Sequence, residues 1–177
     1  MKILLMCEGA NEEKLLELLL DNNKLVITRD DLIGRKPYHI RGLDNPYIKS
    51  ELRRYNKEVL IYRIGDKQND KLKIPVELKD IVFKKNIYKY CTKPELEVLI
   101  IINEKQYRDF LKSKMSPKEY AKKNIKYNKK YYDNATQFYA EYYGGRRIKF
   151  LVDNLIEYKR IKKHNSDELY LSELLKK

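Results

Sequence analysis

The chain opens with a short run from Lys2 to Cys7 that is apolar after its first residue, and this run constrains the fold most. Its apolar residues do not alternate with polar ones, as they do in a strand with one face in water. An unbroken run is typical of a central strand covered on both faces, and such strands occur mostly in parallel sheets flanked by helices. We therefore expect an α/β protein with a largely parallel sheet.

Further strand and helix patterns alternate along the chain and support this fold class. Strands are predicted at 25–28, 59–64 and 87–91. A helix with a leucine-rich face is predicted after Asn11, an N-cap candidate, and a second helix over 47–55. The stretch 37–46 is loop-like in composition. The alternation of strands with helices predicts a small sheet flanked by helices.

The segment that follows residue 91 has two local interpretations. Val98 to Ile102 has strong strand propensity. In contrast, Thr92-Lys93-Pro94-Glu95 has the spacing of a helix capping box with a proline in the first turn. Local rules alone leave both interpretations open.

Helix signals dominate the rest of the chain. They comprise a second capping box at Ser116-Pro117-Lys118-Glu119, a turn at Gly144-Gly145, an apolar helical stripe over 146–163, and a cap at Ser166 for a last short helix through Leu175. No linker of Gly, Ser or Pro interrupts the chain. We therefore expect an α/β core over 1–110 and a basic helical extension over 111–177 packed on the same domain.

The charge of the chain is positive and unevenly placed. Lys and Arg number 39 against 26 acids, a net charge of +13, and residues 112–163 carry +10 of it together with eight of the 16 tyrosines. Lysine and arginine neutralise phosphates, and tyrosine rings stack on unpaired bases, so we expect a nucleic-acid partner. The candidate contact residues are Lys122, Lys123, Lys126, Lys130, Tyr131, Arg146 and Arg147. The alternative is a solvated helix face whose tyrosines pack on the core, with lysine abundance reflecting an AT-rich genome.

Composition also excludes several classes of protein. The mean hydropathy of −0.74 and the lack of an apolar run near 20 residues exclude a membrane span. Two cysteines are too few for a disulfide framework, and the opening residues do not form a signal peptide, so we expect a cytoplasmic protein. No glycine-rich phosphate loop is present, and His39 and His164 have the surroundings of surface residues.

Acidic residues follow two of the predicted strands. Glu8 comes after the first strand, Asp66 comes after the strand at 59–64, and Asp70 lies four residues later. Because parallel strands end at one edge of a sheet, these carboxylates are expected to gather there. Carboxylate oxygens suit a hard cation such as Mg²⁺. The alternative for each residue is a local role in capping a helix or a turn.

The opening MKILLMCEGANEEKLLELL resembles the start of Toprim domains, which catalyse phosphodiester chemistry in primases, topoisomerases and several nucleases. In that pattern the Glu after the first strand is a general acid/base, and an Asp-x-Asp pair after a later strand holds the metal. The resemblance implies the first role for Glu8. It implies metal binding by Asp66, with Mg²⁺ or Mn²⁺ as cofactor. Position 68 is Gln rather than Asp, which departs from the pattern, and Asp70 is the candidate for the missing ligand.

A second motif resembles the RloB-like group of Toprim proteins, which is related to the OLD-type nucleases. In TKPELEVLIIIN, residues 92–103, Pro94, Leu96 and Glu97 match its Pro, Phe and Glu positions, and Asn103 stands where that group often has His. In that group an acid also follows about five residues after the first Glu, and the acid at this spacing here is Glu13. The resemblance covers about residues 1–110. It implies that 94–103 is a buried helix with Glu97 near the metal; the alternative for Glu97 is an acid that stabilises the helix dipole.

These observations lead to three functional hypotheses. The first is a Mg²⁺-dependent nuclease-like protein of the kind found in prokaryotic defence or mobile elements, with Glu8, Asp66, Asp70 and Glu97 as metal-site residues. The second is a catalytically inactive Toprim-like module that binds nucleic acid, or a partner such as an ATPase or effector subunit. The third is a small phage or plasmid protein that binds another protein through its tyrosine-rich face. Gln68 favours the non-catalytic alternatives.

Overall fold

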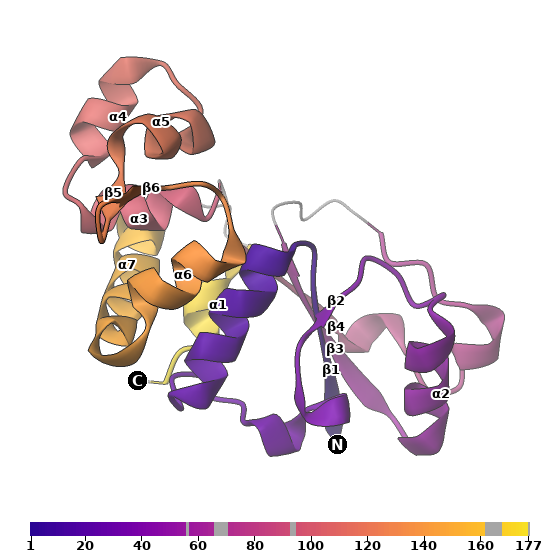
Figure 1. Cartoon of the computed structure of the whole chain (residues 1–177). Coiled ribbons are helices and arrows are strands. Elements are labelled where there is room, and N and C mark those ends of the chain that lie inside the picture. The colour runs from indigo at the N-terminus through magenta and orange to yellow at the C-terminus, as the bar shows by residue number, and fades with distance from the viewer. Residues whose placement is uncertain (56, 66–70, 93–94, 162–167, 177) are drawn as a thin grey trace.

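The computed structural model describes residues 1–55, 57–65, 71–92, 95–161 and 168–176. Its centre is a sheet of five parallel strands (Figure 1). In spatial order they are β2 (Tyr38–His39), β1 (Lys2–Cys7), β3 (Val59–Gly65), β4 (Ile87–Cys91) and β7 (Leu169–Tyr170). The expected α/β class with a largely parallel sheet is confirmed, and it is consistent with a Toprim-like arrangement.

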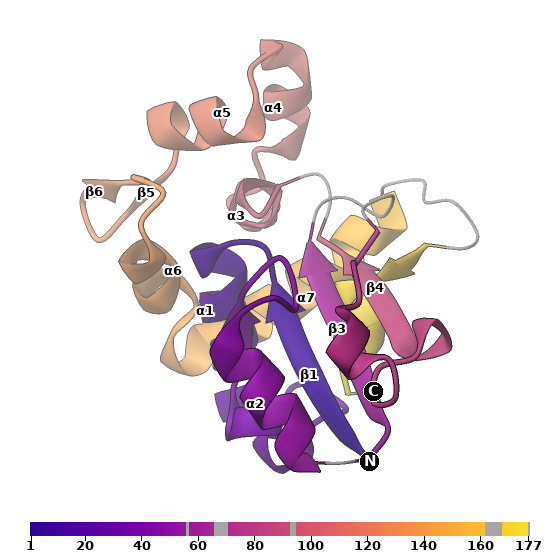
Figure 2. The ribbon, with the colours of Figure 1, turned by 90° about the vertical axis from the view of Figure 1, so that its right-hand side faces the viewer.

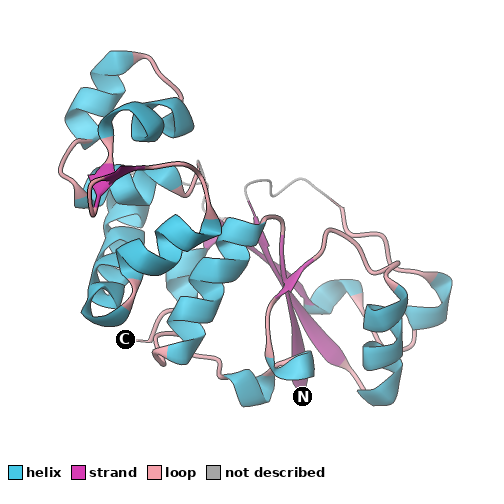
Figure 3. Ribbon diagram, viewed as in Figure 1, coloured by secondary structure: helices cyan, strands magenta, loops and turns pink. Residues whose placement is uncertain are grey.

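Helices cover both faces of the sheet (Figure 3). The helices of the described residues are α1 (Ala10–Asp21), α2 (Pro46–Tyr55), α3 (Glu97–Asn103), α4 (Tyr107–Ser113), α5 (Pro117–Asn124), α6 (Thr136–Tyr143) and α7 (Ile148–Ile161). Of these, α4 and α5 pack on α3 and lie beyond the sheet (Figure 1). Between α5 and α6 the strands β5 (Lys126–Tyr127) and β6 (Lys130–Tyr131) form an antiparallel hairpin. None of the helices within the described ranges combines the length and apolarity needed to cross a bilayer.

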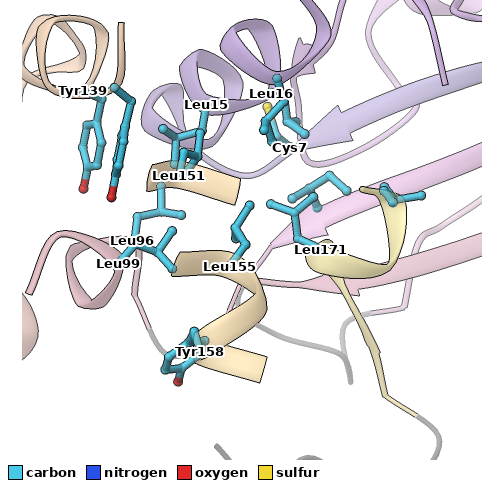
Figure 4. Close-up of a cluster of buried hydrophobic side chains, with 14 of the residues drawn as sticks. Cys7, Leu15, Leu16, Leu96, Leu99, Tyr139, Leu151, Leu155, Tyr158 and Leu171 are labelled. Carbon is cyan, nitrogen blue, oxygen red and sulfur yellow. The ribbon is translucent and has the colours of Figure 1, made fainter. Parts of the chain in front are cut away.

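The alternation of β1 divides the interior into two cores. Ile3, Leu5 and Cys7 face a larger core built with α1, α3 and α5 to α7, which we call the helical core (Figure 4). Leu4 and Met6 face a smaller core built with α2 and the segment 71–86, which we call the α2 core. The two groups of elements lie on opposite sides of the sheet (Figure 2). Both sides of β1 are therefore buried, which explains its unbroken apolar sequence.

Several sequence predictions are confirmed at the level of elements. The strands at 59–64 and 87–91 are β3 and β4, and the helix at 47–55 is α2. Of the two interpretations of 92–103, the helix is correct. The apolar run from Val98 to Ile101 lies in α3 and is buried in the helical core. The capping box at Ser116 and Glu119 is also present: each side chain accepts from the backbone amide of the other residue.

Other predictions are wrong in detail. Residues 25–28 form no strand; Leu25 makes one isolated bridge to Leu175. The predicted loop over 37–46 contains β2. The N-cap of α1 is Gly9 rather than Asn11, and α3 begins at Glu97 after Leu96 rather than at a Thr92 cap. The last helix expected through Leu175 is also wrong, because Leu169–Tyr170 form β7 by pairing with β4 and only a 3₁₀ helix follows at Leu171–Leu174. Its predicted cap, Ser166, lies outside the described residues.

Candidate functional site

The carboxyl ends of the parallel strands form one edge of the sheet, and Glu8 stands on it. The Glu8 amide donates to Ile64 O at 3.2 Å, so the pairing of β1 with β3 continues one residue beyond β1. On the next strand the Thr92 amide donates to Gly65 O at 3.0 Å. Glu8, Gly65 and Thr92 are therefore neighbours along this edge, which is where α/β proteins usually bind ligands.

The side chain of Glu8 lies directly over Gly65. A Cβ atom placed on Gly65 would be 2.3 Å from Glu8 Cδ and 2.6 Å from Oε1, much closer than any real contact. The Glu8 carboxyl thus occupies the space that a side chain at position 65 would need. By the alternation of β1, Glu8 follows Leu4 and Met6 toward the α2 side of the sheet. Glycine at the end of β3 is therefore what allows this carboxyl to lie across the edge.

Two further polar residues near this edge were not identified from the sequence. The His39 ring, at the end of β2, has Nε2 3.1 Å from Glu8 O. Arg63, two residues before Gly65, is only 7% exposed, although the sequence places it within an apolar strand. No local signal indicates that either residue belongs to a site. The two-residue β2 is too short for a periodic pattern, and Arg63 is a single polar residue within a strand.

Other acids lie at the start of α1. Glu12 folds back against Gly9, where an added Cβ would be 2.4 Å from Glu12 Oε2. Burial raises the pKa of the Cys7 thiol, and the nearby carboxylates of Glu13, Glu12 and Glu17 raise it further. Cys7 therefore stays protonated at neutral pH and belongs to the core rather than to a nucleophilic site.

The metal ligands expected beside Glu8 are only partly described. Asp66, Asp70 and the motif residue Pro94 lie outside the described residues. Within the described ranges, no three His, Cys, Asp or Glu side chains are grouped closely enough to hold a metal ion. Glu8 alone supplies too few ligands for Mg²⁺, which takes six oxygens, so the described residues do not form a metal site by themselves.

Glu97, which the resemblance implies to be near the metal, lies in a buried environment. It is buried in the helical core, 7% exposed, and accepts a hydrogen bond from the Tyr132 hydroxyl at 2.7 Å. Tyr132 in turn lies 3.0 Å from the hydroxyl of Tyr139. Glu97 thus lies among tyrosines on the helical side of the sheet, whereas Glu8 is directed to the α2 side. Among the described residues, neither carboxylate belongs to a group of three side chains that could hold a metal ion.

A hydrogen-bond network links Glu97 to the start of α1. Tyr132 has one hydroxyl proton, which Glu97 accepts, so the side-chain atom of Asn134 lying 2.9 Å from that oxygen is its NH₂ group. In this orientation Asn134 also donates to Glu97 at 3.2 Å and accepts from Lys118 Nζ at 3.1 Å. The Asn134 backbone carbonyl accepts from Asn11 Nδ2 at 3.4 Å. Asn11 therefore joins two elements instead of capping its own helix.

The predicted nucleic-acid contacts gather around the hairpin. Lys122 and Lys123 end α5, Lys126 lies on β5, and Lys130 and Tyr131 lie on β6; all five are exposed. The extension expected to be helical over 111–177 is therefore not helical at 126–131, which form a hairpin. Lys126 Nζ lies 4.2 Å from the centroid of the Tyr131 ring, with which it is paired across the strands. The hairpin thus presents lysines and one exposed aromatic ring together.

Arg146 and Arg147 differ although they are adjacent. Arg146 is exposed. Arg147 donates through Nε to Tyr142 O at 2.6 Å, and its guanidinium lies 4.6–5.1 Å from the ring centroids of Tyr127, Tyr142 and Phe150. These contacts make Arg147 a packing residue that joins the hairpin to α6 and α7.

The tyrosines of residues 112–163, which we call the basic region, are mostly internal. Six of the eight are buried in the helical core: Tyr120, Tyr132, Tyr139, Tyr142, Tyr143 and Tyr158. For these residues the alternative interpretation, packing on the core, is correct. Tyr131 is half exposed, at 51%, and remains the candidate for stacking on a base.

No protein-family model matches the sequence, and no curated protein or solved structure shows significant similarity to it. The Toprim resemblance therefore rests on the motifs within residues 1–110 alone.

Proposed function

We propose that this protein processes nucleic-acid phosphodiesters in a Toprim-like, Mg²⁺-dependent reaction, with Glu8 as general acid/base. The observation that carries the proposal is the position of the Glu8 carboxyl across Gly65 at the carboxyl edge of the sheet. Gly65 is bonded to Asp66, so the residue that Glu8 touches is the one that leads into the proposed metal-binding sequence.

Each part of the chain has a role in this proposal. Mg²⁺ or Mn²⁺, held by Glu8, Asp66 and Asp70, would stabilise the charge that develops on the phosphate. Glu8 would exchange a proton with the attacking or leaving oxygen. The lysines of α5 and the hairpin would bind the phosphate backbone. Since Glu97 is engaged by Tyr132 and Asn134, we assign it a structural role instead of a place among the metal ligands.

The test is cleavage of labelled single- and double-stranded DNA and RNA with Mg²⁺, with Mn²⁺ and with EDTA. We expect metal-dependent cleavage that falls at least about 100-fold in both Glu8→Gln and Asp66→Asn, the scale of a lost general acid or base. Asp109→Asn, at an exposed acid on α4, is the matched control and should keep full activity. Cleavage that persists in EDTA or in Glu8→Gln would contradict the proposal.

A second candidate is a Toprim-like module that binds nucleic acid, or a partner such as an ATPase subunit, without cleaving it. Gln68 favours this function, because the Asp-x-Asp pair of the Toprim pattern is incomplete. In the same experiment it predicts salt-sensitive binding with no cleavage under any metal condition. Binding of a protein and not of nucleic acid would favour the partner-binding form.

A further inference from the structure

The net charge outside the basic region lies on one short segment. Residues 71–86 contain five lysines and two acids, so they carry +3, and with the +10 of residues 112–163 they account for the whole net charge of the chain. The segment lies on the α2 side of the sheet, the side to which Glu8 is directed. The region around the hairpin lies on the other side, so positive charge flanks the sheet on both faces (Figure 1).

This segment forms a groove of about 480 Å³ with a positive rim. Four exposed lysines line it: Lys71, Lys73, Lys79 and Lys84. Two neighbouring acids are paired elsewhere, since Glu77 pairs with Lys49 at 2.7 Å and Glu58 pairs with Lys85 at 3.8 Å. Among the described residues, none of the four rim lysines makes an ion pair, so their four positive charges face only one further acid of the segment, the exposed Asp80.

The floor of the groove is apolar. In the sequence Lys71-Leu72-Lys73-Ile74, apolar residues alternate with lysines, and Leu72 and Ile74 pack against the α2 core while the lysines point outward. Buried Val82 and the 39% exposed ring of Phe83 complete the lining. A ligand that fits this groove therefore has negative charges at its edges and a flat or apolar part at its centre.

We propose that this groove is a second binding site for single-stranded nucleic acid, a proposal that rests on the nucleic-acid substrate proposed above. Unpaired bases can lie on the apolar floor and stack on Phe83, while the phosphates meet the lysines. A duplex keeps its bases stacked inside and has nothing to place on the floor. A protein partner fits less well, because lysine is depleted in protein interfaces. A strand held by both the groove and the hairpin would cross the edge where Glu8 lies.

The test measures the affinity of the full chain for a fluorescent 20-nucleotide oligo(dT) as a function of salt concentration. A plot of log K against log[salt] has a negative slope when phosphates are bound. We expect Lys73→Gln/Lys79→Gln to reduce the magnitude of this slope by about 1.4, since each phosphate contact on a single strand contributes about 0.7. Lys57→Gln/Lys176→Gln removes two exposed lysines outside both regions and should leave the slope unchanged. Equal slopes in the groove variant and the wild type would overturn the proposal.

The aromatic floor is tested separately. Phe83→Ala should weaken oligo(dT) binding about fivefold or more, with a much smaller effect on the binding of a 20-base-pair duplex. Phe83→Tyr keeps an aromatic ring and should bind oligo(dT) as the wild type does. If Lys126→Gln/Lys130→Gln lowers the slope and the groove variant does not, the groove proposal fails and the proposed function stands. If the wild type binds no oligonucleotide, both fail. The groove proposal would also be overturned if an acidic, leucine-containing peptide bound in the groove and left the affinity for the oligonucleotide unchanged.

Discussion

Gly65 shows how a single residue sets the geometry of the candidate site. Its missing side chain leaves the space in which the Glu8 carboxyl lies, with an added Cβ only 2.3 Å from Glu8 Cδ. Gly65 is buried at the end of a central strand and Glu8 is half-buried, so a methyl group at position 65 requires the Glu8 carboxyl to move. The two residues are therefore expected to be energetically coupled.

We predict that Gly65→Ala lowers the free energy of unfolding by about 1–3 kcal/mol, because the methyl group overpacks against Glu8. In a Glu8→Ala background the same substitution should cost less, giving a coupling energy of about 0.5–3 kcal/mol in a double-mutant cycle. Urea denaturation of the four proteins measures both values. Gly42→Ala is the control, since its added Cβ would meet only Asp44 Oδ2 at 3.9 Å. Additive effects of the two substitutions would refute the contact.

At the scale of elements, the hairpin is the feature whose conformation differs most from the sequence interpretation. Its two central residues, Asn128 and Lys129, have φ values of 48° and 66°, as in the type I′ turn that suits the twist of a two-residue hairpin. Asparagine tolerates this conformation, whereas lysine is strained in it. The turn therefore carries a conformational cost at position 129.

We predict that Lys129→Gly raises the free energy of unfolding by about 0.5–1 kcal/mol, because glycine adopts positive φ without a steric penalty. Lys129→Val should lower it, since a β-branched residue is disfavoured there. Thermal or urea denaturation distinguishes the three proteins, and Lys123→Gly, in the last turn of α5, is the control for loss of a lysine. A glycine variant no more stable than the valine variant would show that the turn has another conformation.

At the scale of the whole molecule, buried tyrosines make the fold sensitive to alkali. Burial is the largest cause of a raised pKa at nine of them: Tyr38, Tyr90, Tyr120, Tyr132, Tyr139, Tyr142, Tyr143, Tyr158 and Tyr170. In the unfolded chain these groups ionise near their ordinary pKa of 10.0. Above that pH the unfolded state binds fewer protons than the folded state, so the free energy of unfolding falls as the pH rises.

We predict that stability is unaffected by these groups below about pH 9 and decreases steeply above pH 10, by up to about 1.4 kcal/mol per pH unit for each group. In an alkaline titration, a large part of the tyrosinate absorbance at 295 nm should appear only when the far-UV circular dichroism is lost. Protein in 6 M guanidinium chloride, where all tyrosines are exposed, is the control. Complete tyrosine ionisation near pH 10 with retained circular dichroism would contradict the described packing.

Local sequence determined the fold class and most of the central elements. The unbroken apolar run of β1 requires cover on both faces, and that requirement leads to a parallel sheet between helices. The placement of Glu8 at a strand end also follows from the sequence, because the end of the apolar run marks the edge of the sheet. The box at Ser116 and Glu119 was recognised because its hydrogen bonds are made within one turn.

The tertiary structure decided what depends on residues far apart in sequence. It joined Glu97 to Tyr132 by a hydrogen bond, buried six of the eight tyrosines of the basic region, and used Arg147 for packing. It also brought the lysines of 71–84 around an apolar floor. A residue type and its local spacing do not specify which face of the sheet or which core receives the side chain. That choice depends on the free energy of packing distant elements together, which a local pattern does not contain.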